Sequence, residues 1–275
     1  MTVIVAAMPE EMAVLRARLT DVRQITTGAP TTQAVTGRLG GRTVTLAVTG
    51  DGERQAREGI AAVLAAVPAA RLLVLGLAGG LSRDLRAGEL VIAERIVSEA
   101  ASGADTLHAE RTLIDAALRA ITARPAVVVT ANRIADSVAE KQRLLRLAAA
   151  PSAVVDLESA GYARAAVRAG IPWIVLRAVS DTADEALPAL LNRSRDEGGA
   201  VRRGRVVRGL LGELGALPVL LSLRRRLRPC AEALARAAEA LVAAPPDRHA
   251  ASDERREAIV VQPEGQPAAQ TGAPS

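Results

Sequence analysis

Residues 173–184 read WIVLRAVSDTAD. The first seven are apolar except for Arg177, which is typical of a strand that is buried on both faces of a sheet. Polar residues follow directly at Ser180, Asp181 and Asp184. Because α/β proteins bind their ligands beyond the carboxyl ends of buried strands, this stretch predicts a polar site at the edge of a buried sheet.

Outward from this stretch, the first 180 residues alternate apolar runs with helical patterns, which is typical of an α/β protein. We expect strands at residues 3–7, 43–48, 72–77, 90–97, 126–129 and 173–179. We expect helices at residues 10–19, 53–66, 106–122, 137–149 and 158–169, where apolar residues recur three or four positions apart. Residues 38–42, RLGGR, predict a hairpin turn.

The chain divides into three parts. Residues 1–186 form the predicted α/β domain. Residues 187–243 predict a basic helical extension packed on or beside it, with amphipathic helices at 206–223 and 227–243 punctuated by Pro218 and Pro229. Residues 244–275 are rich in Pro, Gln, Ala, Gly and charge, and they predict a disordered tail.

The positive charge of the chain is regional. The 275 residues carry a net charge of +5, but the segment from Arg193 to Arg228 alone carries +7, which leaves −2 for the remainder. The chain also has no Phe, one Trp and one Tyr on which bases could stack. A nucleic-acid-binding domain is therefore a poor description, and we expect no nucleic-acid partner.

Cys230 is the only cysteine. No intramolecular disulfide and no cysteine-based metal cluster can form, so we expect a reducing, cytoplasmic environment. We also expect no metal site. The first twelve residues lack the basic start of a signal peptide, and no apolar run reaches the roughly 18 to 20 residues that a membrane-spanning helix needs. We expect neither a signal peptide nor a transmembrane segment.

Five short segments place glycines or polar residues next to apolar runs, where α/β sheets present ligand sites. They are Met8-Pro9-Glu10-Glu11, Thr49-Gly50-Asp51-Gly52, Gly76-Leu77-Ala78-Gly79-Gly80, Val155-Asp156-Leu157-Glu158-Ser159 and Ser180-Asp181-Thr182-Ala183-Asp184. Taken alone, each carboxylate at a helix start has a simpler interpretation as a partner of the helix dipole.

Taken together and in order, these segments resemble the nucleoside phosphorylase and nucleosidase superfamily, especially its methylthioadenosine/S-adenosylhomocysteine nucleosidase branch, over residues 1–186. The runs Val155-Asp156-Leu157-Glu158 and Arg177-Ala178-Val179-Ser180-Asp181-Thr182-Ala183-Asp184 are the most specific matches. The resemblance implies a three-layer α/β/α fold around a central twisted mixed sheet. It also implies a homo-oligomer and an N-glycosidase of nucleosides that needs no cofactor.

The resemblance also implies catalytic roles. Cleavage of an N-glycosidic bond needs a proton for the departing purine and a nucleophile at the anomeric carbon. Asp181 corresponds to the acid that protonates or hydrogen-bonds purine N7. Glu11 corresponds to the residue that orients and deprotonates the attacking water, with Arg177 as its positioning partner. The simpler alternative is that Arg177 and Asp181 form a buried ion pair and nothing else.

Substrate-binding roles follow in the same way. Glu158 corresponds to the carboxylate that binds the ribose hydroxyls, and Leu157 to the residue that packs against the sugar. The other expected substrate-binding residues are Asp156, Gly79, Leu77, Ile134 and Ser180.

Water is the expected nucleophile. Phosphorylases of this superfamily hold phosphate with arginines after the first strand and before the second glycine loop. Here these places hold Glu10 and Glu11, and the apolar residues 73–75. Since a carboxylate repels phosphate, a hydrolase is favoured over a phosphorylase.

Two departures from the branch concern the substrate. Leu77 stands where the branch has a serine that helps to hold the water, and Ile134 stands where it has a phenylalanine that stacks on the purine. The base pocket is therefore expected to be aliphatic. The alternatives are a methylthioadenosine/S-adenosylhomocysteine nucleosidase, a purine nucleoside phosphorylase, and a non-catalytic nucleoside-binding protein that kept the fold.

The C-terminal part carries a second resemblance. Residues 181–188, 208–211 and 217–223 look like those of the hopanoid-associated nucleosidases, which release adenine from adenosylhopane to leave ribosylhopane. This resemblance implies a nucleoside with a bulky, apolar 5′ group that is taken from a membrane. The Arg193–Arg228 region would then contact an anionic membrane at its inner face. The alternative is a helix pair that packs on the sheet with a solvated arginine face.

Overall fold

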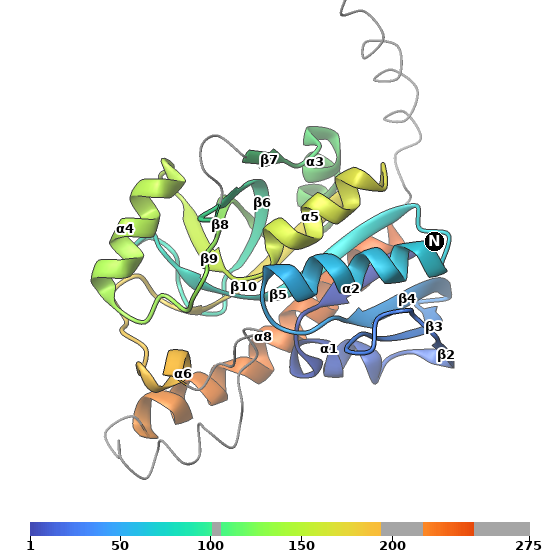
Figure 1. Ribbon diagram of the computed structural model, residues 1–275, viewed down its shortest axis with the longest axis horizontal. Helices are drawn as coiled ribbons and strands as arrows, with labels where there is room; N and C mark the ends of the chain where they lie inside the picture. Colours follow the sequence, from blue (N-terminus) through green and yellow to red (C-terminus); the bar gives the residue numbers. More distant parts are fainter. Residues whose placement is uncertain (101–105, 194–216, 245–275) are drawn as a thin grey trace, which may run out of the picture. The chain divides into compact units, whose positions relative to one another are not determined.

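The computed structural model describes residues 1–100, 106–193 and 217–244 (Figure 1). Its strands are β1 (Thr2–Ala6), β2 (Thr20–Ile25), β3 (Gln33–Leu39), β4 (Arg42–Val48), β5 (Arg71–Gly80), β6 (Leu90–Ser98), β7 (Thr106–His108), β8 (Arg124–Thr130), β9 (Ala153–Asp156) and β10 (Trp173–Asp181). Its helices are α1 (Pro9–Arg16), α2 (Glu53–Ala66), α3 (Arg111–Ala120), α4 (Val138–Ala148), α5 (Ser159–Arg168), α6 (Leu190–Arg193) and α8 (Leu217–Ala243).

The described strands form one mixed sheet that closes on itself at one side. Strands β5, β10, β6, β8 and β9 pair in a ring, because β5 pairs with both β10 and β9. From β5 the sheet continues through β1, β4, β3 and β2. Parallel pairing of β1, β5 and β10 brings their carboxyl ends to the same edge, which is where the predicted site residues lie.

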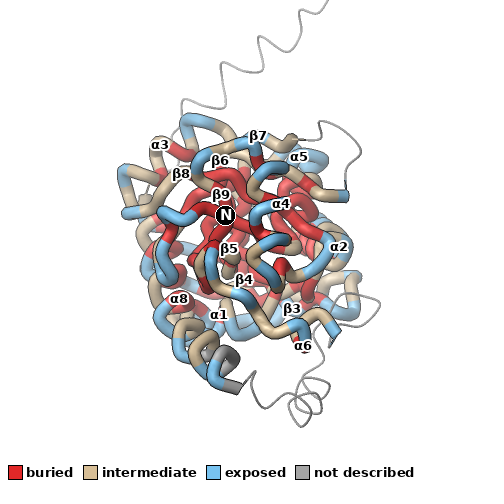
Figure 2. Tube along the Cα trace, turned by 90° about the vertical axis from the view of Figure 1, so that its left-hand side faces the viewer, coloured by how far each residue is buried: buried red, intermediate tan, exposed pale blue. Residues whose placement is uncertain are grey.

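Successive side chains of the central strands pack alternately into two apolar cores, one on each face of the sheet. Val3 and Val5 of β1 face helices α2 and α5, whereas Ile4 and Ala6 face α1, α3 and α8. The same alternation runs through β5 and β10, and the buried strands occupy the centre of Figure 2. The sheet is thus covered by helices on both faces, which confirms the predicted α/β class.

Strands account for most of the errors in the sequence prediction. The helix expected at residues 106–122 begins only at Arg111, because residues 106–108 pair with β6 as strand β7. Strands β2, β3 and β9 were not predicted as strands, although the hairpin turn at 38–42 joins β3 to β4 as expected. Gly40 and Gly41 have φ values of 54° and 79° there, in the region that favours glycine.

The C-terminal helix also differs from the prediction. Instead of two helices at 206–223 and 227–243, α8 runs unbroken from Leu217 to Ala243 with Pro229 inside it. Packing compensates for the hydrogen bond that the proline removes, since Cys230, Leu234 and Leu241 of this helix are buried in the core beside α1 and β10. Residues 206–216 and 245–275 lie outside the described residues, as does most of the basic segment.

Helix α8 packs against α1 and β10. Residues Met1–Pro245 form one compact unit, and in Figure 1 the helix runs along the face that also carries α1. Within the described part of the chain, none of the helices combines the length and the apolarity that crossing a membrane requires.

Replacing Leu234 by alanine tests whether α8 is part of the core. Leu234 has no exposed surface, whereas Leu221 on the same helix is 45% exposed. We expect Leu234→Ala to lower the free energy of unfolding by about 3 kcal/mol, because truncation of a buried leucine leaves a cavity. The matched Leu221→Ala is expected to cost less than about 1 kcal/mol. Urea denaturation measures both, and equal effects would contradict the packing.

Candidate active site

Five separate segments of the chain meet at the carboxyl edge of the central strands. They are the start of α1, the turn before α2, the end of β5, the junction of β9 and α5, and the end of β10. These are the five segments that the sequence marks as candidates. The structure therefore brings together residues as distant in sequence as Glu11 and Arg177.

Glu11 is held from two sides. It lies in the first turn of α1, where its Oε2 accepts a hydrogen bond from the backbone N–H of Met8 at 2.9 Å. Its Oε1 accepts from the backbone N–H of Leu77 at 2.9 Å. Burial raises the pKa of Glu11, and Arg177 and the two backbone donors partly offset the rise. A carboxylate with a raised pKa in a fixed orientation suits a general base.

Arg177 has no exposed surface. Its guanidinium lies 2.6 Å from the Asp156 carboxylate and donates to Ser159 Oγ at 3.0 Å. Burial alone would lower the pKa of Arg177, but the nearby carboxylates of Asp156, Glu158 and Glu11 raise it, so the side chain is a permanent cation.

Gly76 makes room for this arginine. A Cβ atom at Gly76 would lie 1.8 Å from Arg177 Nη1 and 3.0 Å from Glu11 Oε1. The guanidinium and the Glu11 carboxylate are therefore neighbours across a position that only glycine can occupy.

The alternative of an Arg177–Asp181 ion pair is wrong. Arg177 pairs with Asp156, and Asp181 pairs with Lys141. Residues four apart in a strand are separated by about 13 Å along it, and a β-bulge between Val179 and Asp181 shifts the register as well.

Asp156 supports the site from within the protein. Its Oδ1 accepts from Thr130 Oγ1 at 3.0 Å, and its Oδ2 accepts from Ser159 Oγ at 2.5 Å besides contacting Arg177. The backbone N–H of Ser159 also donates to Oδ1 at 3.3 Å, so each oxygen has two protein partners and its acceptor capacity is filled. The geometry favours a role in positioning Arg177 over the substrate contact that the sequence suggested.

Glu158 is a buried carboxyl group among other acids. Its Oε1 accepts from the backbone N–H of Gly52 at 2.9 Å, and its side chain is hydrogen-bonded to that of Asp51. Burial, the hydrogen bond to Asp51 and the charge of Asp156 raise the pKa of Glu158 well above its ordinary value. Tyr162 Oη, which also lies within the influence of the Glu158 charge, is 2.6 Å from Thr49 Oγ1. Burial raises the pKa of this phenol as well.

Asp181 ends β10 and is 2% exposed. Ser180 Oγ donates to Asp181 Oδ1 at 2.5 Å, and Lys141 Nζ lies 2.5 Å from Oδ2. A Cβ at Gly79 would lie 3.1 Å from the same Oδ2, so this glycine admits the carboxylate. Sequence reasoning missed Lys141 as a site residue, although its status as the only lysine in the chain was a visible signal.

The remaining predicted residues contact other parts of the protein. Leu77 contributes its backbone N–H to Glu11, which a serine would do equally, and its side chain packs on the apolar core. Leu157 packs on the cluster around β8 and β9. Ile134 lies in the loop between β8 and α4, where Asn192 of α6 accepts from its N–H at 3.0 Å and donates to its C=O at 2.8 Å.

The family model of the phosphorylase superfamily matches residues 2–212. The chain belongs to this superfamily. The predicted superfamily is thereby confirmed. Within the described residues, no group of three or more His, Cys, Asp or Glu side chains is arranged to hold a metal ion.

Relatives by sequence and by structure agree with this assignment. The chain is 27% identical over 205 residues to a 5′-methylthioadenosine/S-adenosylhomocysteine nucleosidase of Marinomonas sp., covering 67% of this chain and 87% of the relative. A solved S-adenosylhomocysteine nucleosidase of Streptococcus pyogenes superposes with a TM-score of 0.70 at 19% identity, covering 89% and 97% of the two chains. Futalosine hydrolase of Helicobacter pylori superposes with a TM-score of 0.69 at 20% identity, covering 88% and 96%. The named relatives are nucleosidases and a hydrolase, in agreement with the predicted class of enzyme.

The raised pKa of Glu158 predicts a pH-dependent cost in stability. Between its ordinary value of 4.5 and the raised value, the folded protein holds a proton that the unfolded chain releases, so stability falls as the pH rises through this range. Glu158→Gln keeps the uncharged form. We expect it to be more stable than wild type at pH 8, with a difference that shrinks towards pH 4.5 at up to about 1.4 kcal/mol per pH unit. Urea denaturation at several pH values checks this.

The exposed Glu58 offers the matched control, because Glu58→Gln removes a carboxylate that is 56% exposed. Its effect is expected to stay within about 0.5 kcal/mol at every pH. A Glu158→Gln protein whose stability follows the wild type in parallel across the pH range would contradict the assignment.

Proposed function

We propose that this protein is a nucleosidase that hydrolyses the purine–ribose bond of an adenine nucleoside. In the reaction, the bond between C1′ and N9 breaks and its electron pair goes to the purine, while the oxygen of water bonds to C1′. Glu11 takes the proton of the water. Asp181 protonates or hydrogen-bonds N7, and Glu158 binds the ribose hydroxyls.

The observation that carries the proposal is the geometry of Glu11. Its carboxylate is fixed by the N–H groups of Met8 and Leu77, its pKa is raised by burial, and the Arg177 cation is its neighbour. A base that is oriented in this way can deprotonate a water molecule at the edge of the sheet where Glu158 and Asp181 also lie.

The same contacts support water over phosphate. The N–H of Leu77 is used by Glu11, and the Arg177 guanidinium is engaged by Asp156 and Ser159. The Leu77 N–H is therefore not left to hold a phosphate anion, and the charges of Glu11 and Asp156 would repel one. A purine nucleoside phosphorylase is therefore the weaker candidate.

Replacing Asp181 by asparagine tests the reaction. We expect wild-type protein to release adenine from methylthioadenosine or adenosine in phosphate-free buffer, and Asp181→Asn to lower turnover at least about 100-fold, since general acid catalysis contributes factors of 10² to 10⁴. Asp184→Asn is the matched control, because Asp184 is 62% exposed and lies three residues away. Turnover that requires phosphate would overturn the hydrolase, and a loss below about threefold for Asp181→Asn would overturn its role.

We propose further that the preferred substrate carries a large apolar 5′ group, as in adenosylhopane. The aliphatic residues at 77 and 134, the helix α8 and the motifs shared with hopanoid-associated nucleosidases support this choice. The second candidate is a 5′-methylthioadenosine/S-adenosylhomocysteine nucleosidase, favoured by the named relatives. The homo-oligomer implied by the resemblance stays a prediction.

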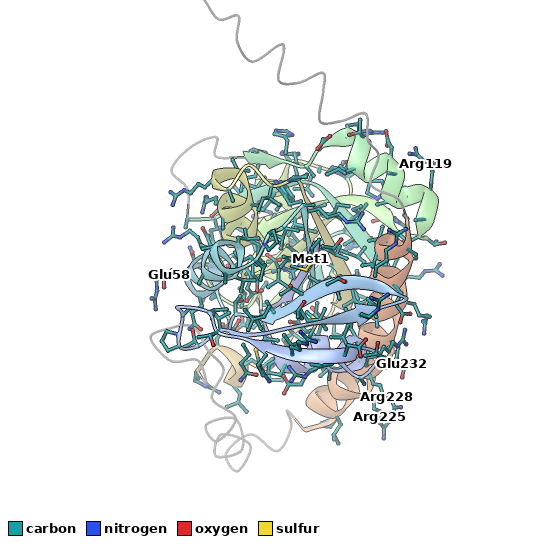
Figure 3. All side chains as sticks on the ribbon, turned by 90° about the vertical axis from the view of Figure 1, so that its right-hand side faces the viewer. Met1, Glu58, Arg119, Arg225, Arg228 and Glu232 are labelled. Atoms are coloured by element: carbon teal, nitrogen blue, oxygen red, sulfur yellow. The ribbon has the colours of Figure 1, made fainter. Side chains whose placement is uncertain are left out.

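A lipid-linked substrate needs contact with a membrane, and we propose that the first half of α8 contributes to it. Arg225, Arg228 and Leu221 are exposed on this half, and Figure 3 shows both arginines directed away from the body of the protein. Exposed arginines next to an apolar side chain suit an anionic lipid surface.

One experiment tests both the substrate and the membrane contact. Adenosylhopane is presented in vesicles that contain anionic phospholipid, and adenine release is compared for wild type and Arg225→Gln/Arg228→Gln. We expect the double variant to lose about 30-fold in activity on the vesicles, because each of the two basic residues near the headgroups contributes about 1 kcal/mol. Its activity on soluble methylthioadenosine is expected to stay unchanged.

Arg54→Gln/Arg111→Gln, which removes two exposed arginines from α2 and α3, is the matched control for net charge. Equal losses in the two double variants would overturn the membrane contact. A higher kcat/KM for methylthioadenosine than for adenosylhopane would favour the second candidate.

A further inference from the structure

Lys141 is the only lysine among the 35 basic Lys and Arg residues of the chain. It lies in the first half of α4 and is 1% exposed, which is unusual for a side chain that is normally found at the surface. A buried ammonium group is unfavourable unless nearby acceptors compensate for the water that it loses.

The acceptors around Lys141 account for every hydrogen of its ammonium group. Nζ lies 2.5 Å from Asp181 Oδ2, 2.6 Å from the carbonyl oxygen of Thr182 and 2.8 Å from that of Glu185. An ammonium group has three hydrogens to donate. Lys141 therefore has no donor left for a substrate, and any effect that it has on a substrate passes through Asp181.

Asp181 is correspondingly held on both oxygens. Lys141 holds Oδ2, and Ser180 Oγ, which also contacts the carbonyl oxygen of Ala78 at 3.2 Å, holds Oδ1 at 2.5 Å. The carboxylate belongs to β10, whereas the lysine belongs to α4, so the contact joins two elements that are about 40 residues apart. The orientation of the carboxylate is thus set by the position of α4.

The shape of the acceptor group explains why this position is lysine in a chain that otherwise uses arginine. Three oxygens from residues 181–185 converge on a single nitrogen atom. A compact ammonium can donate to all three at once, whereas a planar guanidinium spreads its donors over a wider fork. Charge alone would not require lysine here.

We propose that Lys141 is the positioning residue of Asp181: it holds the carboxylate in the orientation in which this side chain meets the purine. This inference rests on the proposed function for the role of Asp181. Lys141 itself touches no reacting atom, so it acts on the rate and on base binding only through its partner.

Arg226 of α8 provides a matched control. It holds the same loop from another side, donating to the carbonyl oxygen of Ser180 at 3.3 Å and to Glu185 Oε2 at 2.7 Å. Its hydrogen bonds do not go to the Asp181 carboxylate. If the cations serve only to order the loop, removal of either one should have the same effect on activity.

A double-mutant cycle tests the proposal. Wild type, Lys141→Met, Asp181→Asn and the double variant are compared by the kcat and KM of adenine release and by calorimetric affinity for adenine. We expect Lys141→Met to lower kcat about 100-fold, and the double variant to be within about threefold of Asp181→Asn, because coupled residues are not additive. Lys141→Arg is expected to be as impaired as Lys141→Met, and Arg226→Met to keep kcat within about threefold.

Other outcomes overturn the proposal. They are losses that multiply in the double variant, a kcat for Lys141→Met close to wild type, and equal losses for Lys141→Met and Arg226→Met. Lys141→Met leaves a buried carboxylate without its partner, so Lys141→Gln, whose amide can still donate to Asp181, replaces it in the cycle if the methionine variant does not fold.

The proposed function is tested separately by the wild-type protein. If wild type releases no adenine from any nucleoside, the proposed function fails. The role of Lys141 is then decided from the adenine affinities of the four proteins, in which the losses of the two single variants are again expected not to multiply in the double variant. A wild-type protein that binds no adenine overturns the positioning role as well.

Discussion

The buried ion pair between Arg177 and Asp156 is the contact on which the rest of the site depends. Taking a guanidinium and a carboxylate out of water costs several kcal/mol per ion, which is recovered only when each group is fully hydrogen-bonded. In the protein, Ser159 accepts from the guanidinium, Thr130 donates to the carboxylate and Gly76 leaves space for the pair, so that Arg177 Nε is the one guanidinium nitrogen without a hydrogen-bond partner among the described residues. These partners come from β5, β8, β10 and the β9–α5 junction, so one ion pair ties together four neighbouring parts of the ring of strands.

Around this pair the protein buries more acidic side chains than stability alone would favour. Glu11, Glu158 and Asp51 lie close together, and burial raises the pKa of the two glutamates. Such groups are expensive to bury, and strongly perturbed pKa values cluster at functional sites for this reason. The arrangement holds two carboxyl groups and a cation in fixed positions before any substrate arrives, which suits the preorganised catalysis of the proposed reaction.

The C-terminal helix α8 also supports the site. Its buried residues complete the apolar core over β5 and β10, and Arg226 and Cys230 contact the carbonyl oxygens of Ser180 and Val179 at the carboxyl end of β10. A segment that looks like an appendage because of its charge therefore supports the strand that carries Arg177 and Asp181. Its outer arginines are left exposed because the inner face of the helix is used for packing.

By itself, the sequence determined the class of the fold and the segments of the site. The buried strands and main helices follow from apolar periodicity, which is local, and the acidic and glycine motifs mark strand ends in the correct order. Short or exposed strands such as β2 and β7 were not predicted, because pairing with neighbouring strands rather than local preference makes them strands.

Only the tertiary structure decided which charges are partners. Arg177 and Asp181 are near in sequence, yet the extended strand and the bulge at Ser180 separate them, and each finds its partner on another element. Lys141 became a site residue for the same reason, since nothing in the sequence around it indicates that its ammonium group reaches the end of β10. The pairing of buried charges depends on distances across the fold, and no local pattern in a chain encodes those distances.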